Sequence, residues 1–114
     1  MIKIKRIYEI PSEDDGYRIL VDRLWPRGVS KEFATLDEWN KTITPSPELR
    51  IWFNHQAERF ETFSALYKEE LTNFSEELHR LKTLSETQNL TLLYAAKDPK
   101  INHAIVLLDV LNKI

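Results

Sequence analysis

Two short segments of this chain contain runs of consecutive apolar residues, and this feature most constrains the fold. One is residues 17–22, which contain the run Ile19-Leu20-Val21, and the other is the stretch 90–95. Successive side chains of a β-strand point to opposite faces, so a strand that is apolar throughout needs cover on both faces of its sheet. Such cover is typical of parallel sheets flanked by helices. The sequence therefore predicts an α/β fold with a small, largely parallel sheet of three or four strands flanked by helices.

The remaining elements follow from periodicity and capping signals. Ile2 and Ile4 alternate with lysines and indicate a first strand at the N-terminus. Ser46-Pro47 pairs an N-cap residue with proline at the first helical position, which predicts a helix to about residue 53. Aromatic residues and leucines recur every three or four positions over 58–87, which predicts two consecutive helices there.

Three boundaries depend on local signals. Asn73 with Glu76 resembles a capping box at the start of the second of these two helices. Asp98-Pro99 repeats the cap-and-proline signal and predicts a final helix from there to about residue 112. Residues 30–43 suit both a helix and a strand, and we expect a short helical turn at 30–33 followed by a strand.

Length and composition exclude several classes of protein. The 114 residues, 42% hydrophobic and 30% charged, predict a single globular domain over 1–114. No cysteine is present, which excludes thiol catalysis, disulfides and cysteine-ligated metals. No basic start is followed by a long apolar run, so we expect a cytoplasmic protein without a membrane partner. With only two glycines, the chain has no phosphate-cradling glycine loop and no dinucleotide fingerprint.

Polar residues gather where two of the predicted strands end. One cluster runs from Asp22 to Gly28 and the other from Lys97 to His103. If both strands run the same way, the clusters share the C-terminal rim of the sheet, where open α/β sheets bind ligands. Arginine offers a rigid fork of donors that matches phosphate or carboxylate, so the rim predicts an anion site. The candidate residues are Asp22 and Asp98 for catalysis and Arg23, Trp25, Arg27, Ser46, Lys97, Asn102 and His103 for ligand binding.

Several of these residues also have structural interpretations. Asp22 could orient an arginine, accept a ribose hydroxyl or act as a general base, but Asp22-Arg23 could equally be an ion pair at a strand end. Asp98 suits a helix cap better than a catalyst. The three histidines, at 55, 79 and 103, include no pair at the four-residue spacing of a helical zinc site. We therefore predict no metal and no cofactor, and His55 suits a helix end.

The sequence also resembles a known family. The run from Leu20 to Val29, LVDRLWPRGV, is similar to the YeaO-like bacterial branch of the family called domain of unknown function 488. The resemblance extends over the chain and implies a small cytosolic α/β protein whose activity is not established. Its further residues are Asp37, Trp39, Pro45-Ser46, Leu49-Arg50, Trp52-Phe53, His55, Leu92-Leu93-Tyr94, Lys97-Asp98 and Asn102-His103.

Two departures from the family pattern matter. Longer relatives carry a Cys-His-Arg motif after the last strand, where this chain has Asn102-His103-Ala104. The thiol and the arginine of that motif are therefore absent here. Gln56-Ala57 follows His55, where the family tends to have an acidic or amide residue and proline. This second difference weakens any transfer of that loop's geometry.

Three functions remain open on the sequence. The first is a site for a small anionic ligand, such as a nucleotide or a phosphorylated metabolite, with or without catalysis. The second is a protein-interaction module, a homodimer included, that uses exposed Trp25, Trp52 and Phe53 beside Arg50. The third is nucleic-acid binding through residues 1–31, which carry seven basic and five acidic side chains. A net charge of −2 and the lack of a recognised motif place it last.

Overall fold

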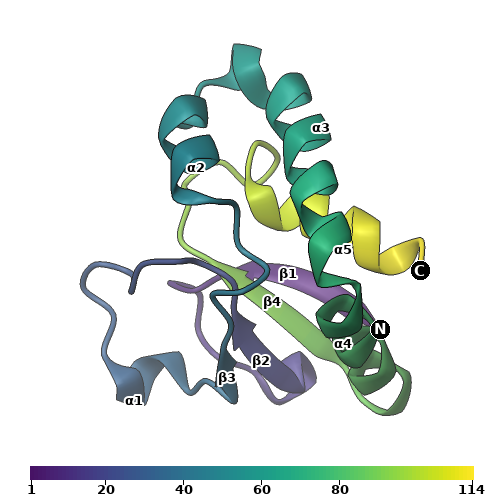
Figure 1. Cartoon of the computed structure of the whole chain (residues 1–114). Coiled ribbons are helices and arrows are strands. Elements are labelled where there is room, and N and C mark those ends of the chain that lie inside the picture. Colours follow the sequence, from purple (N-terminus) through teal and green to yellow (C-terminus); the bar gives the residue numbers. More distant parts are fainter.

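A computed structural model describes all residues, 1–114, and contains one four-stranded sheet (Figure 1). Every neighbouring pair of strands is parallel, and the order across the sheet is β1-β4-β2-β3. The expected α/β class and strand number are confirmed. The strands are β1 (Ile2–Arg6), β2 (Tyr17–Leu20), β3 (Glu38–Trp39) and β4 (Leu90–Tyr94).

Helices cover the sheet unequally on its two faces. Five α-helices and three short 3-10 helices lie between the strands or after the last of them, and none has the length and apolar character needed to cross a membrane. The α-helices are α1 (Lys31–Ala34), α2 (Pro47–Phe53), α3 (Phe60–Leu71), α4 (Ser75–Thr87) and α5 (His103–Asn112). The 3-10 helices are η1 (Glu13–Asp15), η2 (Ala57–Arg59) and η3 (Thr72–Phe74).

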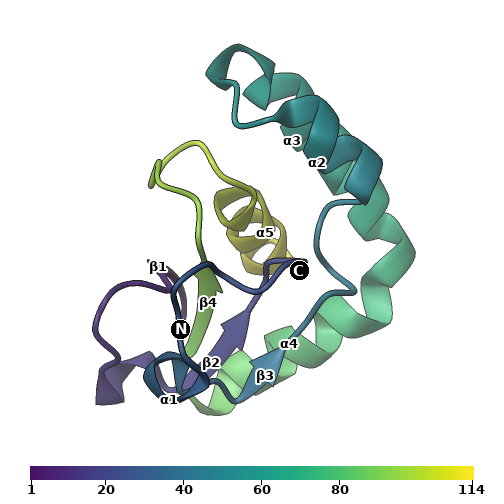
Figure 2. The same cartoon turned by 90° about the vertical axis from the view of Figure 1, so that its left-hand side faces the viewer.

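Alternation along the central strands explains this layering. Ile19 and Leu92 face the larger core, which α3, α4 and α5 complete. Leu20 and Leu93 face the opposite side and pack with Ala34 of α1 in a smaller cluster. Figure 2 shows α1 on one side of the sheet and α4 and α5 on the other. The two segments with apolar side chains on both faces are therefore buried between layers, as their composition requires.

The helix that follows β4 begins later than its sequence signal predicts. Asp98-Pro99 does not start α5, because the Asp98 carboxylate instead accepts hydrogen bonds from the Lys100 and Ile101 amides and closes a turn. Asn102 is the true N-cap, since its side chain accepts from the Ile105 amide. The Asp98-Pro99 signal thus marks a real local structure, but a turn rather than a helix.

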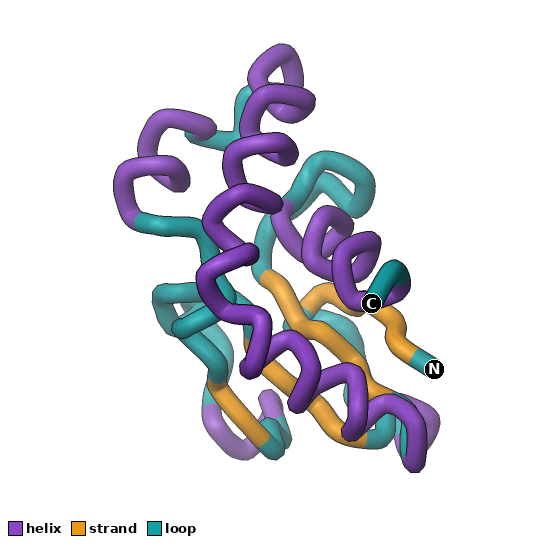
Figure 3. The backbone as a smooth tube through the Cα atoms, turned by 45° about the vertical axis from the view of Figure 1, so that its right-hand side comes forward, coloured by secondary structure: helices purple, strands orange, loops and turns teal.

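Of the other two boundaries, the predicted start of α4 is wrong and the predicted order of helix and strand in 30–43 is confirmed. No capping box forms at Asn73, because η3 continues the helical path from α3 directly into α4 and no side chain caps α4 (Figure 3). The ambiguous residues 30–43 do form a short helix and then a strand. Ser30 caps α1 by accepting from the Phe33 amide, and β3 is only two residues long.

A buried carboxylate ties the turn before β2 to the small-cluster face of the sheet. Asp15 lies among Lys3, Lys5 and Arg18, and it is nearly inaccessible to solvent. Burial by itself would raise the pKa of Asp15, but hydrogen bonds from the Ser12 amide, Lys5 and Arg18 lower that pKa from 3.8 to about 2. Nothing in the sequence patterns marks this cluster in advance, since its members come from three separate segments.

Candidate functional site

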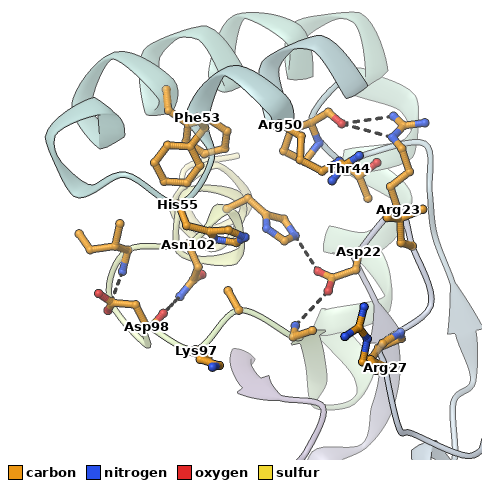
Figure 4. Close-up of a pocket in the computed structure, with 18 of the residues that line it drawn as sticks. Asp22, Arg23, Arg27, Thr44, Arg50, Phe53, His55, Lys97, Asp98 and Asn102 are labelled. Atoms are coloured by element: carbon orange, nitrogen blue, oxygen red, sulfur yellow. Dashed lines mark hydrogen bonds and ion pairs between the residues drawn. The ribbon is translucent and has the colours of Figure 1, made fainter.

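A cavity of about 610 Å³ lies at the C-terminal ends of β2 and β4. The loops that follow these strands line one side of it, and α2 with the start of α3 lines the other. Figure 4 shows Asp22 and Lys97 facing Arg50 and Phe53 across this space. Because all strands are parallel, the two polar clusters that follow β2 and β4 meet at one rim, as the sequence predicts.

The cavity brings together eight of the nine candidate residues. Only Ser46 lies outside it. Ser46 instead caps α2, where its hydroxyl accepts from the Leu49 amide and donates to the Glu70 carboxylate at 2.6 Å. Its role is thus to fasten α2 to α3. The eight residues at the cavity are Asp22, Arg23, Trp25, Arg27, Lys97, Asp98, Asn102 and His103.

Asp22 and His103 form the best-ordered pair in the cavity wall. Asp22 accepts a hydrogen bond from the Ala95 amide at 3.0 Å, which joins the ends of β2 and β4. His103 Nε2 lies 2.7 Å from the Val21 carbonyl oxygen and 3.1 Å from Asp22 Oδ1. Asp22 Oδ1 has no hydrogen-bond partner of good geometry, so its contact with the imidazole is electrostatic. Both side chains are more than four-fifths buried.

Asp98 and Asn102 are occupied with the backbone of their own loop. Asp98 is exposed and holds the turn described above. Asn102 is 1% exposed; its amide donates to the Asp98 carbonyl at 2.8 Å while its oxygen caps α5. The loop that presents Lys97 and His103 is therefore held by these two side chains.

We expect Asn102→Ala to lower the free energy of unfolding by about 1–2 kcal/mol, because it removes the N-cap of α5 and the hydrogen bond to the Asp98 carbonyl. Chemical denaturation followed by fluorescence measures this loss. Asn73→Ala, which removes an exposed asparagine that caps nothing, is the control and should stay within about 0.5 kcal/mol. Equal effects of the two substitutions would contradict the capping role of Asn102.

Four cations line the cavity without a carboxylate partner. No aspartate or glutamate oxygen lies within ion-pair distance of any of them. Arg23 donates to the Pro45 carbonyl through two long contacts of 3.3 and 3.4 Å, so it does not pair with Asp22. The structural ion pair considered for Asp22-Arg23 therefore does not form. The four cations are Arg23, Arg27, Arg50 and Lys97.

Sequence reasoning missed the half of the cavity that α2 and α3 supply. Arg50 and His55 face the site from α2 and its C-terminal turn, and Phe53 stacks on Phe63 at 4.2 Å behind them. Asn54, not His55, is the C-cap of α2, and both have positive φ angles, of 47° and 56°. The only sequence signal for these residues is the Leu49 to His55 part of the family resemblance.

The aromatic residues do not form the exposed patch that the interaction hypothesis assumes. Phe53 is buried in the larger core, so its predicted exposure is wrong. Trp25 is half-buried, donates to the Val29 carbonyl at 2.7 Å and meets Trp39 edge to face. Trp52 alone among the three is exposed. No group of three acidic or histidine side chains is arranged to hold a metal ion.

Comparison with known proteins identifies the family. Residues 1–114 match a family model described as the inactive DUF488-N3 subclade. The chain is 49% identical over 113 residues to the uncharacterized protein YeaO of Escherichia coli strain K12, covering 99% of this chain and 98% of that protein. It is 40% identical over 111 residues to the uncharacterized protein Rv3073c of Mycobacterium tuberculosis, covering 97% and 93% of the two chains. No solved structure matches it significantly.

The LVDRLWPRGV run that first suggested this family also forms much of the cavity wall. The chain therefore belongs to the DUF488 family, in the YeaO-like branch described as the inactive DUF488-N3 subclade.

Proposed function

We propose that the cavity at the sheet rim binds a small anionic molecule, such as a nucleotide or a phosphorylated metabolite. The observation that carries this proposal is the gathering of four unpaired cations around one cavity. Cations held close together repel one another, and an anionic ligand removes that repulsion and accepts their hydrogen bonds. Helix α5 begins at the same rim, since Asn102 and His103 line the cavity, and the positive end of its dipole also favours negative charge there.

The proposal concerns binding and assigns no reaction. Asp98 already accepts two backbone hydrogen bonds, and Asp22 accepts one and faces an imidazole. These contacts favour a role for both carboxylates in holding the site in place over a role in exchanging protons with a substrate. The description of the matching subclade as inactive agrees with a binding role.

A thermal-shift screen with nucleoside monophosphates, sugar phosphates and pyrophosphate tests the proposal. We expect at least one of these anions to raise the melting temperature of the wild-type protein. Arg27→Ala and Arg50→Ala should each weaken that binding about tenfold or more, because a charge-assisted hydrogen bond contributes roughly 1.5–3 kcal/mol.

Lys100→Ala is the control for these variants. It removes one positive charge from an exposed residue close to Lys97 that does not line the cavity, so its affinity should match the wild type within about twofold. If the screen yields no ligand, or if Lys100→Ala loses as much affinity as Arg50→Ala, the cavity is not the anion site.

Protein interaction is the second candidate function, and it rests on a different surface. Trp52 of α2 and Leu66 of α3 line a shallow groove on the far side of the helical hairpin, and about two fifths of each side chain is exposed. A homodimer through this groove would bury both. Sedimentation velocity of the wild type and of Leu66→Glu tests it: a wild-type dimer that the substitution dissociates supports this role, and a wild-type monomer removes the homodimer.

A further inference from the structure

We propose that His103 binds the anion directly, through Nδ1 of its protonated ring, so that ligand binding takes up a proton and weakens as pH rises. This inference rests on the proposed anion site and concerns the regulation of that site. It depends on which ring nitrogen is engaged by the protein, which one is free, and which charges surround the ring.

The contact made by Nε2 fixes the tautomer of His103. His103 Nε2 lies 2.7 Å from the Val21 carbonyl oxygen. A carbonyl can only accept a hydrogen bond, so Nε2 must carry the hydrogen in both the neutral and the protonated ring. Proton gain and loss by His103 therefore take place at Nδ1.

The other ring nitrogen, Nδ1, has no partner in the protein. No protein group hydrogen-bonds to this nitrogen, and it is not fully buried, since the one buried side-chain atom without a hydrogen bond is Asp22 Oδ1. The ring lines the cavity. Nδ1 is therefore reachable from the cavity: it presents a lone pair when the ring is neutral and an N–H donor when the ring is protonated. An anion accepts a hydrogen bond from the protonated form and is repelled by the lone pair of the neutral form.

Charged groups from several elements surround the His103 ring. Asp22, after β2, lies 3.1 Å from Nε2 and favours the protonated ring. Lys97 from the β4–α5 loop and Arg50 from α2 share the cavity and disfavour it. The remaining neighbours with titratable or charged groups are Arg23 and Arg27 after β2, Asp98 before α5, His55 after α2, and Tyr67 of α3, whose ring centroid lies 6.3 Å away.

The balance of these charges changes when an anion binds. His103 is the first residue of α5, where the helix dipole also disfavours a cation. In the empty site the carboxylate of Asp22 is thus opposed by several positive groups. A bound anion neutralises those groups and places a second negative charge beside the ring, so that protonation of His103 and anion binding favour each other.

Sulfate is the probe that isolates this coupling, because it stays a dianion from pH 5.5 to 8.5 while phosphate changes its own charge. We expect the wild-type protein to bind sulfate about tenfold more tightly at pH 5.5 than at pH 8.5 by isothermal titration calorimetry. Between pH 5.5 and 8.5, nitrogen-15 spectra of the His103 ring should show that the midpoint of its titration lies at higher pH in saturating sulfate than without sulfate.

Three variants test whether the pH dependence of sulfate binding comes from His103. His103→Gln should bind sulfate with the same constant at both pH values, whereas His79→Gln, on the exposed face of α4, should keep the wild-type dependence. His55→Gln tests the other histidine of the cavity: it can weaken sulfate binding, but binding should still be tighter at pH 5.5 than at pH 8.5 if His103 is the group that takes up the proton. The ring titration is measured on the wild-type protein and does not depend on whether a variant folds.

The outcomes separate the two proposals. Sulfate binding that is equal at both pH values, or that loses its pH dependence only in His55→Gln, overturns the role of His103 and leaves the anion site intact. An absence of saturable sulfate binding at every pH overturns the anion site itself, and with it this inference.

Discussion

Asp15→Ala is expected to lower the free energy of unfolding at pH 7 by about 3–5 kcal/mol, because it leaves a buried charge without its partner. Arg18 is 4% exposed and its guanidinium pairs with Asp15, and Lys5 Nζ lies 3.1 Å from the same carboxylate. Without Asp15 these cations face one another with no negative charge between them. Urea denaturation of the wild type and the variant measures the difference.

Lys3→Ala is the matched control for this prediction. Lys3 contacts the same carboxylate at 3.5 Å, but its side chain is about one third exposed. Partly exposed ion pairs contribute roughly 0–1 kcal/mol, so the control should lose no more than that. A loss below about 1 kcal/mol in Asp15→Ala would contradict the structural role of the buried cluster.

The same carboxylate predicts how stability depends on pH. The pKa of Asp15 is lowered from 3.8 to about 2 by folding, so the unfolded chain takes up this proton first as pH falls. Stabilisation from this group is therefore complete above about pH 4 and is lost as pH falls toward 2, an effect of roughly 2 kcal/mol. The stability of Asp15→Ala should fall less steeply across this interval, as denaturation at several pH values can show; parallel curves would contradict the assignment.

Gly16→Ala is the second substitution with a large expected effect, about 2–4 kcal/mol of lost stability. Gly16 has a φ of 63°, and a Cβ at this position would lie 2.3 Å from the Asn89 carbonyl oxygen. That oxygen accepts the hydrogen bond from the Tyr17 amide at 2.8 Å, beside the first residue pair of β2 and β4. Relief of the clash therefore requires the two central strands to separate at this end.

Gly28→Ala distinguishes this clash from backbone strain. Gly28 also has a positive φ, 77°, but a Cβ there meets nothing within 4 Å. Its cost should be the conformational one alone, about 1–2 kcal/mol. Thermal or urea unfolding of the two variants gives the comparison, and equal losses would show that the contact with Asn89 is unimportant.

The sequence predicts the sheet well because burial on both faces leaves a direct pattern. Strands β2 and β4 carry apolar side chains on both faces, and parallel pairing then requires the residues after them, Asp22 and Lys97 among them, to meet at one rim. The start of α5 is not predicted correctly. Asp98 satisfies the local capping pattern, yet its carboxylate closes a turn, and only the three-dimensional path of the loop selects Asn102 as the cap.

The opposite wall of the cavity could not be predicted in the same way. Arg50 and His55 reach the site only because α2 and α3 pack back over the strand ends, with Phe53 stacked on Phe63. No local pattern encodes that packing. The Asp15 cluster was missed for the same reason, since Lys3, Lys5 and Arg18 are brought to one carboxylate by strand pairing.

The most direct test of the central claim is a proton–nitrogen NMR titration of the wild-type protein with pyrophosphate. We predict saturable shifts of the backbone amides in residues 22–27 and 95–103 and of the Arg50 side chain, which surround the cavity. The partly exposed cluster of Lys3 and Lys5 around Asp15 is the other group of cations on this molecule that could attract an anion. Shifts centred on that cluster, or no saturable shifts at all, would contradict an anion site at the rim of the sheet.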